Sequence, residues 1–295
     1  SMSNLPPRQG VTYRGPITDT SRWKNFRHRP DDIFICTPPK CGTTWTQAIC
    51  AMLIFGKVEH GMQSSQRSPW VDAQFAPIDE YLEQIEAQTH RRYIKTHSPL
   101  DGIPYYPECS YLVVCRDPRD VYCSNLNHRD NMQDEELAFN VFTSGDNAFR
   151  DWIAREQEPG GWDKQSLQLL THFLQTYWDS RDLPNIHLFH YSDMKRDLRV
   201  SIATMAAALS IEVDDDFLDA MAEAARFENM KKNASSFAPE VGTDMWKQDS
   251  KFFASGRNGQ WRELLSDADL EAFDARLAEL ATPEQAHWLL NGGQA

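Results

Sequence analysis

The stretch that decides the fold runs from residue 33 to residue 45 and reads Ile33-Phe34-Ile35-Cys36-Thr37-Pro38-Pro39-Lys40-Cys41-Gly42-Thr43-Thr44-Trp45. Its first four residues are apolar and predict a short strand buried on both faces. The two prolines cannot continue a helix or a strand ladder, so the chain must turn at Lys40-Cys41-Gly42. A helix is expected from Thr43, because apolar residues recur at helical spacing as far as Leu53 and Gly56 supplies a stop. This succession is typical of an anion-binding loop.

The turn has the chemistry of a cradle for a phosphate or a sulfate. Gly42 lets the backbone approach a ligand closely, and the helix that follows brings partial positive charge at its N-terminus. The hydroxyl groups of Thr43 and Thr44 add hydrogen-bond donors, and Lys40 adds a full charge. The alternative at this point is an ordinary strand-to-helix turn whose lysine is only solvated.

Composition limits the kind of anion that the loop could bind. The chain has 295 residues, 41% of them hydrophobic, and a formal net charge of −13. We expect a single domain over residues 1–295, since no linker-like stretch divides the sequence. The negative charge argues against nucleic acid and anionic membranes as partners and favours a small anion in a local basic pocket.

No stretch approaches the roughly 20 apolar residues of a membrane span, and no signal-peptide core is visible at the N-terminus.

The cysteines predict the compartment. The six cysteines form no Cys-x-x-Cys pair, and several occupy positions expected to be buried in strands or helices. We therefore expect a reduced, cytoplasmic protein without structural zinc. Histidines other than His97 are scattered without ligand spacing and receive no role: they include His90, His128, His172, His187, His190 and His287.

Short apolar runs alternate with helical patterns along the chain. Strands are expected at residues 33–36, 93–96, 111–115 and 186–191, and helices at 119–128, 136–154, 164–181, 195–209, 215–226, 267–280 and 283–291. This alternation predicts an α/β fold with a central parallel sheet covered by helices. Ligands of such sheets bind beyond the carboxyl ends of the strands. The polar residues that follow the predicted strands are Lys40, Lys95, His97, Arg116 and Tyr191.

Together these segments resemble the cytosolic sulfotransferases, in a bacterial-type member. Residues 38–45 are similar to the family's Y-P-K-S-G-T-T-W loop, and residues 95–99 to its K-T-H-L-P segment. Residues 116–124 resemble R-N-P-K-D-x-x-x-S, and residues 252–261 resemble F-x-R-K-G-x-x-G-x-W. The resemblance covers nearly the whole chain. It implies a P-loop-kinase-like core with helices on both faces of the sheet, 3′-phosphoadenosine 5′-phosphosulfate (PAPS) as the donor, and adenosine 3′,5′-bisphosphate (PAP) as the product.

The resemblance also implies a role for each candidate catalytic residue. His97 is the general base, since an imidazole titrates near ~6.5 and can take a proton at neutral pH. Lys40 stabilises charge on the bridging oxygen, and Lys95 supports the transferring group. Ser124 holds the 3′-phosphate and, before substrate arrives, Lys40. The ordinary alternative for His97 is a capping or packing histidine.

The nucleotide site implied by the family is larger. The expected cofactor-binding residues are Lys40, Cys41, Gly42, Thr43, Thr44, Trp45, Arg116, Ser124, Tyr191, Phe227, Arg257, Asn258 and Gly259. Trp45 and Phe227 stack on adenine in this interpretation, and are core aromatics in the alternative one. No metal ligand is expected.

The sequence departs from the family pattern at several positions. Pro38 and Cys41 replace a tyrosine and a serine, and the position of Cys41 acts mainly through its amide. The arginine-lysine pair that contacts the 3′-phosphate is replaced by Ala254-Ser255, and Arg257 is the candidate substitute. Residues 262–271 resemble the family's K-x-x-x-T-V-x-x-x-E dimer motif imperfectly, with Asp267 in place of the valine, so a homodimer is an open expectation.

The acceptor pocket is expected from residues 62–75, 142–152 and 237–245. Their side chains predict a hydrophobic phenol, alcohol or amine as acceptor: they include Trp70, Phe75, Phe142, Phe149 and Met245. A P-loop kinase is one alternative, with Asp117 in the place of a Walker-B aspartate, although Lys40 precedes Gly42 and Arg116 would repel magnesium. A catalytically inactive nucleotide-binding homologue is another alternative. Its support is Ala254-Ser255, which replaces the basic pair of the family.

Overall fold

A parallel sheet of four strands, in the order β2-β1-β3-β4, forms the centre of the computed structural model. The model describes residue 7 and residues 10–59, 68–232 and 258–295. The strands are β1 (Ile33–Cys36), β2 (Tyr93–Thr96), β3 (Ser110–Cys115) and β4 (Ile186–His190). Ile33 pairs with Tyr93 on one side and with Ser110 on the other, and Tyr111 of β3 pairs with Ile186. The predicted strands are therefore confirmed, and β4 ends one residue early because Tyr191 begins a helix.

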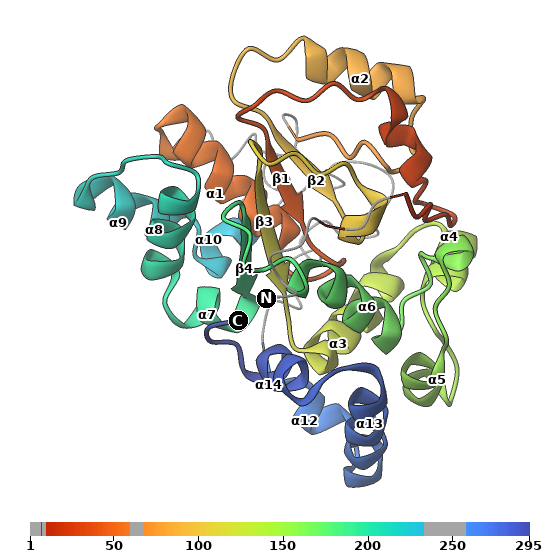
Figure 1. The fold of residues 1–295 in the computed structure, drawn as a ribbon. Coiled ribbons are helices and arrows are strands. Elements are labelled where there is room, and N and C mark those ends of the chain that lie inside the picture. Colours follow the sequence, from red (N-terminus) through yellow and green to blue (C-terminus); the bar gives the residue numbers. More distant parts are fainter. Residues whose placement is uncertain (1–6, 8–9, 60–67, 233–257) are drawn as a thin grey trace.

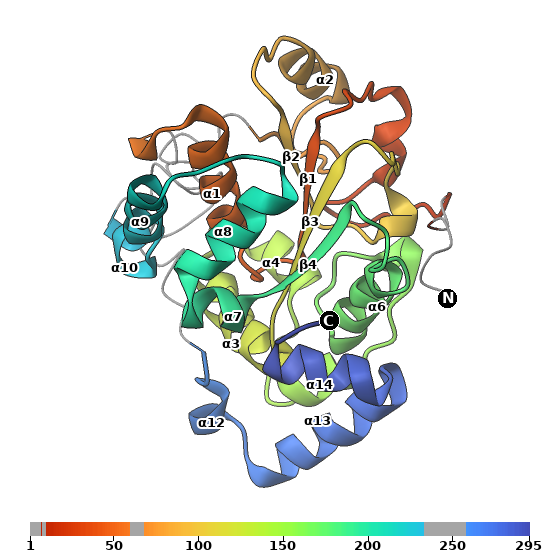
Figure 2. The same ribbon diagram turned by 60° about the vertical axis from the view of Figure 1, so that its left-hand side comes forward.

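Alternating residues of each strand face opposite sides of the sheet, and helices cover both sides (Figures 1 and 2). Ile33 and Ile35 belong to one buried apolar cluster, whereas Phe34 and Cys36 belong to the other. The first cluster packs on α1 (Thr43–Phe55), α7 (Tyr191–Arg196), α8 (Leu198–Ala208), α9 (Asp215–Ala224) and α10 (Phe227–Lys232). All four residues of β1 are buried, as expected of a strand covered on both faces.

The second cluster contains helices from both ends of the chain. It packs on α2 (Ile78–Glu86), α3 (Pro118–Asn131), α5 (Ala148–Ala154), α6 (Leu167–Trp178), α12 (Trp261–Leu264), α13 (Asp267–Leu280) and α14 (Pro283–Asn291). Short 3-10 helices at Thr20–Asn25, Leu100–Gly102 and Pro159–Gly161 complete this layer. A small separate cluster joins α4 (Glu135–Val141) to Met132, Phe142 and Ile17.

Two of the predicted helices were wrong in extent. The pattern at 136–154 is divided into α4 and α5, because Phe142 is extended directly after α4, with φ −115° and ψ 145°, and Gly145 is left-handed, with φ +88°, before α5 begins. The pattern at 195–209 begins at Leu198, because Asp197 is extended at φ −145° and its carboxylate accepts a hydrogen bond from the amide of Val200. In the described part of the chain, no helix combines the length and the apolar character needed to cross a membrane.

The parallel register brings the carboxyl ends of the strands to one edge. Cys36 pairs with Thr96, and Cys115 pairs with His190. The residues that follow these positions, Thr37, His97, Arg116 and Tyr191, therefore emerge at the same edge of the sheet.

Candidate functional site

The loop between β1 and α1 holds two residues in the left-handed conformation. Gly42 precedes α1 at φ +97°, and Lys40 has φ +66°, which is rare for a residue with a side chain. The carbonyl oxygen of Gly42 accepts hydrogen bonds from the amide and the hydroxyl of Thr46, at 2.9 and 2.8 Å. The first amides of α1 have no partner within the helix and can bind an anion. Strained backbone of this kind is concentrated at functional sites, and both of these residues line a cavity.

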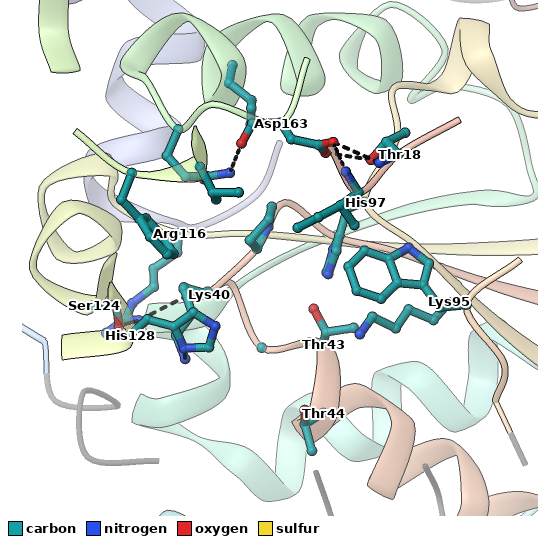
Figure 3. A pocket seen from close by; sticks show the side chains of 18 of the residues that line it. Thr18, Lys40, Thr43, Thr44, Lys95, His97, Arg116, Ser124, His128 and Asp163 are labelled. Carbon is teal, nitrogen blue, oxygen red and sulfur yellow. Dashed lines mark hydrogen bonds between the residues drawn. The ribbon is translucent and has the colours of Figure 1, made fainter. Parts of the chain in front are cut away.

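A cavity lies over this loop at the carboxyl edge of the sheet (Figure 3). The predicted residues that line it are Lys40, Gly42, Thr43, Thr44, Trp45, Lys95, His97, Arg116, Ser124, Tyr191 and Phe227. One part of its wall is thus formed by the strand ends and the anion loop. The rest of the lining is mainly apolar and comes from the small separate cluster around α4 and from the second cluster. It includes Ile17, Met132, Val141, Phe142, Trp162 and Leu169.

The orientation of His97 is set by the end of the neighbouring strand. Its Nδ1 lies 2.5 Å from the carbonyl oxygen of Thr37 and 3.4 Å from the hydroxyl of the same residue. That hydroxyl is also hydrogen-bonded to the hydroxyl of Thr43, which begins α1. Because a carbonyl oxygen can only accept, the neutral imidazole carries its proton on Nδ1 and keeps Nε2 as an acceptor.

Burial lowers the pKa of His97 well below the ordinary value of 6.5, and the charges of Lys95 and Lys40 lower it further. The sequence-based expectation that this imidazole titrates near 6.5 is therefore corrected. The hydrogen bond to Thr37 acts in the opposite direction but is the smaller effect. The side chain is neutral across the physiological range, which is the form a general base requires.

A buried carboxylate holds the residues on either side of His97. Asp72 has no solvent exposure, and its Oδ2 accepts hydrogen bonds from the hydroxyls of Thr96 at 2.6 Å and Ser98 at 2.8 Å. The indole of Trp23 donates a third bond to the same oxygen at 3.0 Å. The strand end that carries His97 is thereby fixed on both sides. The sequence offered no signal for Asp72, because its partners are distant in the chain.

Trp70 lies against both the predicted base and one predicted lysine. The ammonium group of Lys95 is 4.0 Å from the centre of the indole, and the His97 ring meets it edge-on at 4.7 Å. The indole face attracts the ammonium group electrostatically. Lys95 and His97 are therefore held side by side by one aromatic ring, on the right of the cavity in Figure 3.

Lys40 has a partner that the sequence did not predict. Its Nζ lies 3.0 Å from Nδ1 of His128, which also lines the cavity. Burial lowers the pKa of His128 well below its ordinary value, followed by the charges of Lys40 and Lys95. His128 follows Ser124 by four residues on α3, so the two side chains share one helix face. That spacing is the signal in the sequence that points to His128.

Arg116 joins several of the predicted nucleotide ligands. Its Nη1 donates to the hydroxyl of Ser124 at 3.2 Å and to the carbonyl oxygen of Lys40 at 3.1 Å. Its Nε and Nη2 reach Oδ1 of Asn258 at 3.4 and 3.3 Å, and its guanidinium lies 4.1 Å from the centre of the Tyr191 ring. Four segments of the chain thus meet at one buried arginine. A cationic corner of this kind suits a phosphate group.

The neighbours of that corner are only partly described. The amide of Gly259 donates to Oδ1 of Asp120 at 2.7 Å, so this glycine holds the segment in place through its backbone. Arg257, Ala254 and Ser255 lie outside the described residues. The predicted substitution of the missing basic pair by Arg257 stays a prediction.

The two predicted adenine-stacking residues lie in the cavity wall. Trp45 is 6% exposed, and its indole donates to the carbonyl oxygen of Ala225 at 2.7 Å. Phe227 begins α10 and lines the same cavity. Cys41 is fully buried, and burial raises the pKa of its thiol to about 12, so its side chain is chemically inert. This agrees with a loop position that acts through its amide.

The apolar part of the cavity contains some of the predicted acceptor residues. Trp70, Phe75 and Phe142 line it, whereas Met245 lies outside the described residues. The prediction for Phe149 was wrong: it packs in the core against Tyr122 and Trp152, because α5 turns this face toward α3 and α6.

Sequence reasoning missed the N-terminal segment of the cavity wall. Asp163 accepts hydrogen bonds from the amides of Ile17 and Thr18, both at 2.7 Å, and from the Thr18 hydroxyl at 2.6 Å. Gly15 is needed there, since a Cβ atom would lie 2.3 Å from the Asp163 carboxylate. Among the described residues, no group of three or more His, Cys, Asp or Glu side chains could hold a metal ion.

Comparison with known proteins relates the chain to sulfate-transferring enzymes. The model of the sulfotransferase domain matches residues 30–283. A glycolipid sulfotransferase of Mycobacterium bovis (strain BCG / Pasteur 1173P2) is 33% identical over 317 residues, which cover 98% of this chain and 97% of the relative. Human sulfotransferase 1C2 is 28% identical over 273 residues, which cover 88% of this chain and 86% of the relative.

Solved structures have the same fold. Retinol dehydratase, in complex with androsterone and the inactive cofactor PAP, aligns with a TM-score of 0.69 at 20% identity, over 90% of this chain and 87% of that one. Mouse sulfotransferase SULT7A1, complexed with PAP, aligns with a TM-score of 0.67 at 19% identity, over 92% of this chain and 91% of that one.

Proposed function

The chain belongs to the sulfotransferase domain family, and from this premise we propose that it transfers the sulfuryl group of PAPS to a hydroxyl or amine of a small hydrophobic acceptor. The observation that carries the proposal is the composition of one cavity. It combines an anion loop, two lysines and a neutral histidine with an apolar wall. An anionic donor and an apolar acceptor can meet there at His97.

The donor fits the side of the cavity formed by the strand ends. The loop amides after Gly42 and the hydroxyls of Thr43 and Thr44 would receive the 5′-phosphosulfate. Arg116 and Ser124 would receive the 3′-phosphate, because they meet at 3.2 Å in a buried corner. Two of the solved structures with this fold are described as PAP complexes, which supports a nucleotide of this class as the donor.

The chemistry follows from the three charged or basic side chains around the acceptor. The acceptor oxygen attacks sulfur while Nε2 of His97 takes its proton, and the bond from sulfur to the bridging phosphate oxygen breaks. Lys40 donates to that bridging oxygen as its negative charge develops, and Lys95 donates to the sulfuryl oxygens. PAP leaves with the negative charge, and the sulfate ester remains. His97 then releases its proton to solvent.

The acceptor fits the apolar wall. This wall contains the aromatic rings of Trp70, Phe75, Phe142 and Trp162. A phenol or alcohol with a hydrophobic body is therefore favoured over a charged sugar as the acceptor. The mycobacterial relative is named for a glycolipid acceptor, which likewise unites hydroxyl groups with an apolar part. The homodimer, the cytoplasmic location and the independence from metal stay predictions.

The kinase alternative loses its main support in the geometry. Both carboxylate oxygens of Asp117 bond to Arg119, at 3.1 Å to Nε and 2.8 Å to Nη2, and Oδ1 also caps α3 through the Arg119 amide. A Walker-B aspartate must face a magnesium ion. Asp117 is instead committed to the start of its own helix.

A direct assay tests the function. The protein is incubated with PAPS and a panel of phenols and alcohols, with and without EDTA, and PAP release and the sulfated product are measured. We expect release that depends on an acceptor and persists in EDTA. Activity with ATP that EDTA abolishes would establish the kinase instead. Tight PAP binding without release on any acceptor would identify an inactive homologue.

A further inference from the structure

Gln165 places a polar side chain in the wall of the main cavity. The residue is 4% exposed and lies between the main cavity and a second, smaller one, since it lines both. Its Nε2 donates to the carbonyl oxygen of Asp163 at 3.1 Å, and its amide donates to the carbonyl oxygen of Val141 at 2.6 Å. Its side-chain oxygen Oε1 is a hydrogen-bond acceptor.

Two residues that line the smaller cavity carry buried polar atoms that are unpaired among the described residues. Both amide atoms of Asn125 and the indole nitrogen of Trp152 are buried and have no partner in the part of the chain that the structure describes. Tyr122, Leu126 and Phe142 form much of the remaining wall. The space is ≈ 10 Å³, enough for one water molecule or one hydroxyl group. We call this space, with Asn125, Trp152 and Gln165, the polar recess.

The polar recess adjoins the site of transfer. Phe142, like Gln165, lines both cavities. On the side of the main cavity its ring lies 5.9 Å from that of His128, the partner of Lys40. On the side of the recess, Asn125 directly follows Ser124, the partner of Arg116. Asp163, which binds the Gln165 side chain, lies at the top of the cavity in Figure 3, away from Thr43 and Thr44.

The donors and acceptors of the recess match a hydroxyl group. Asn125 Nδ2 and Trp152 Nε1 can donate, whereas Asn125 Oδ1 and Gln165 Oε1 can accept. A hydroxyl accepts two hydrogen bonds and donates one, so it can pair with both donors and with one of the acceptors. An ether or carbonyl oxygen would leave the two acceptors unpaired, and an ammonium group would leave the two donors unpaired. The match does not depend on how the Asn125 amide is oriented, because both of its atoms are unpartnered.

We propose that the polar recess binds a second hydroxyl group of the acceptor, so that the preferred substrate is a hydrophobic diol of which one hydroxyl is sulfated. The inference rests on the proposed function. The second hydroxyl bonds to Gln165 and Asn125 at the edge of the apolar wall while the first lies at His97. A site built to bind a hydroxyl discriminates strongly against the analogue that lacks it, since its buried polar groups are then left unpaired.

The test compares matched acceptors. Each dihydroxynaphthalene isomer is measured against 2-naphthol, with PAPS saturating, and the isomers vary the distance between the two hydroxyls. We expect at least one isomer to exceed 2-naphthol by about 10-fold or more in kcat/KM. Equal rates for every isomer and for 2-naphthol would overturn the recess as an acceptor subsite while the proposed function stands. No PAP release with any compound would instead refute the proposed function.

Variants then locate the effect. Gln165→Met and Asn125→Leu keep the volume and remove the polar atoms, so each should abolish most of the diol preference, measured as the ratio of kcat/KM for the diol to kcat/KM for 2-naphthol. Gln175→Leu is the control, because Gln175 lies on α6, which begins two residues after Gln165, and bonds to the carbonyl oxygen of Leu280 instead. A recess that holds only a structural water would give lower melting temperatures with an unchanged diol preference, and would overturn the proposal. Should a variant fail to fold, the comparison of acceptors on the unaltered protein decides the matter.

Discussion

His97 donates its Nδ1 proton to the carbonyl oxygen of Thr37 across 2.5 Å, and this leaves Nε2 as the unprotonated nitrogen that can accept a proton. Replacing His97 by glutamine keeps a polar side chain but removes the basic nitrogen. We expect turnover to fall at least about 100-fold, because a positioned base contributes that much, while PAP affinity is retained. PAP release measures the first and calorimetry the second. His287→Gln is the control, and turnover near that of the unaltered protein in His97→Gln would refute the assignment of the base.

The same environment makes a prediction about pH. The pKa of His97 in the folded protein is well below 6.5, mainly through burial, whereas in the unfolded chain it is near 6.5. As the pH falls below about 6.5, the unfolded chain takes up the proton first, so the free energy of unfolding decreases. We expect the melting temperature to decrease from pH 7.5 to pH 5.5, and to decrease less in His97→Gln. An imidazole signal of His97 that titrates at or above pH 6.5 by NMR in the free protein would contradict this prediction.

Asp72 is expected to support catalysis without touching substrate. Its carboxylate holds the hydroxyls of Thr96 and Ser98 on either side of His97. Removing it in Asp72→Ala frees that strand end, and we expect kcat to fall at least ~10-fold, since small displacements of a catalytic group are costly. Asp72→Asn keeps an acceptor oxygen and should restore much of the loss.

The matched control for Asp72 is Asp163, another buried carboxylate with three donors in the cavity wall. Asp163→Asn loosens residues 17 and 18 of the acceptor side, so it should raise the KM for the acceptor and leave kcat nearly unchanged. Equal losses of kcat in both variants, tracking loss of melting temperature, would show that Asp72 has only a structural role.

The strands could be predicted closely because their signals are local. Residues 33–36 form an unbroken apolar run between aspartates and prolines, and β1 has these bounds in the structure. The polar residue after each strand then locates the site, since parallel strands end at one edge. The family assignment and the enzyme class rested on these positions, and both are confirmed.

The rest of the site depends on contacts between distant segments. The tautomer of His97 depends on a carbonyl group of another strand, and the N-terminal wall depends on Asp163 binding Thr18. Neither contact leaves a periodic pattern in the sequence. Helix extents failed for a related reason: the apolar spacing continues through residues 136–154, whereas the extended backbone of Phe142 ends α4 and Gly145 is left-handed.

Gly42 is expected to be required by both its backbone conformation and its surroundings. At φ +97° an alanine would be strained, and its Cβ would lie 3.3 Å from the Tyr191 ring. We expect Gly42→Ala to lower the free energy of unfolding by about 1–2 kcal/mol, measured by urea denaturation. Gly145→Ala shares the strained backbone, with φ +88°, but its added Cβ would have no atom within 4 Å. Gly160→Ala has neither a positive φ nor an atom within 4 Å of the added Cβ. A Gly42→Ala variant as stable as Gly160→Ala would contradict the expected strain.

Arg116 should determine how strongly the 3′-phosphate contributes to nucleotide affinity. Its guanidinium bonds at once to Ser124, to the carbonyl oxygen of Lys40 and to Asn258. The single ammonium group of a lysine cannot reproduce this planar set of donors. We expect Arg116→Lys to weaken PAP binding by about 10-fold or more, and adenosine 5′-monophosphate binding much less, because the second ligand lacks the 3′-phosphate.

The dissociation constant of adenosine 5′-monophosphate divided by that of PAP separates the effect of the 3′-phosphate from a change in the loop. Arg116 also bonds to Lys40, so a disturbed loop would weaken both ligands equally and leave the ratio unchanged. An unchanged ratio would refute the 3′-phosphate assignment. A ratio that is smaller in Arg116→Lys than in the unaltered protein would support it. Arg276→Lys is the control, because Arg276 also donates to a backbone carbonyl, that of Ile153, but lies on α13. Arg257→Gln, measured in the same way, tests whether Arg257 supplies the charge that Ala254-Ser255 lacks: a ratio equal to that of the unaltered protein would exclude it.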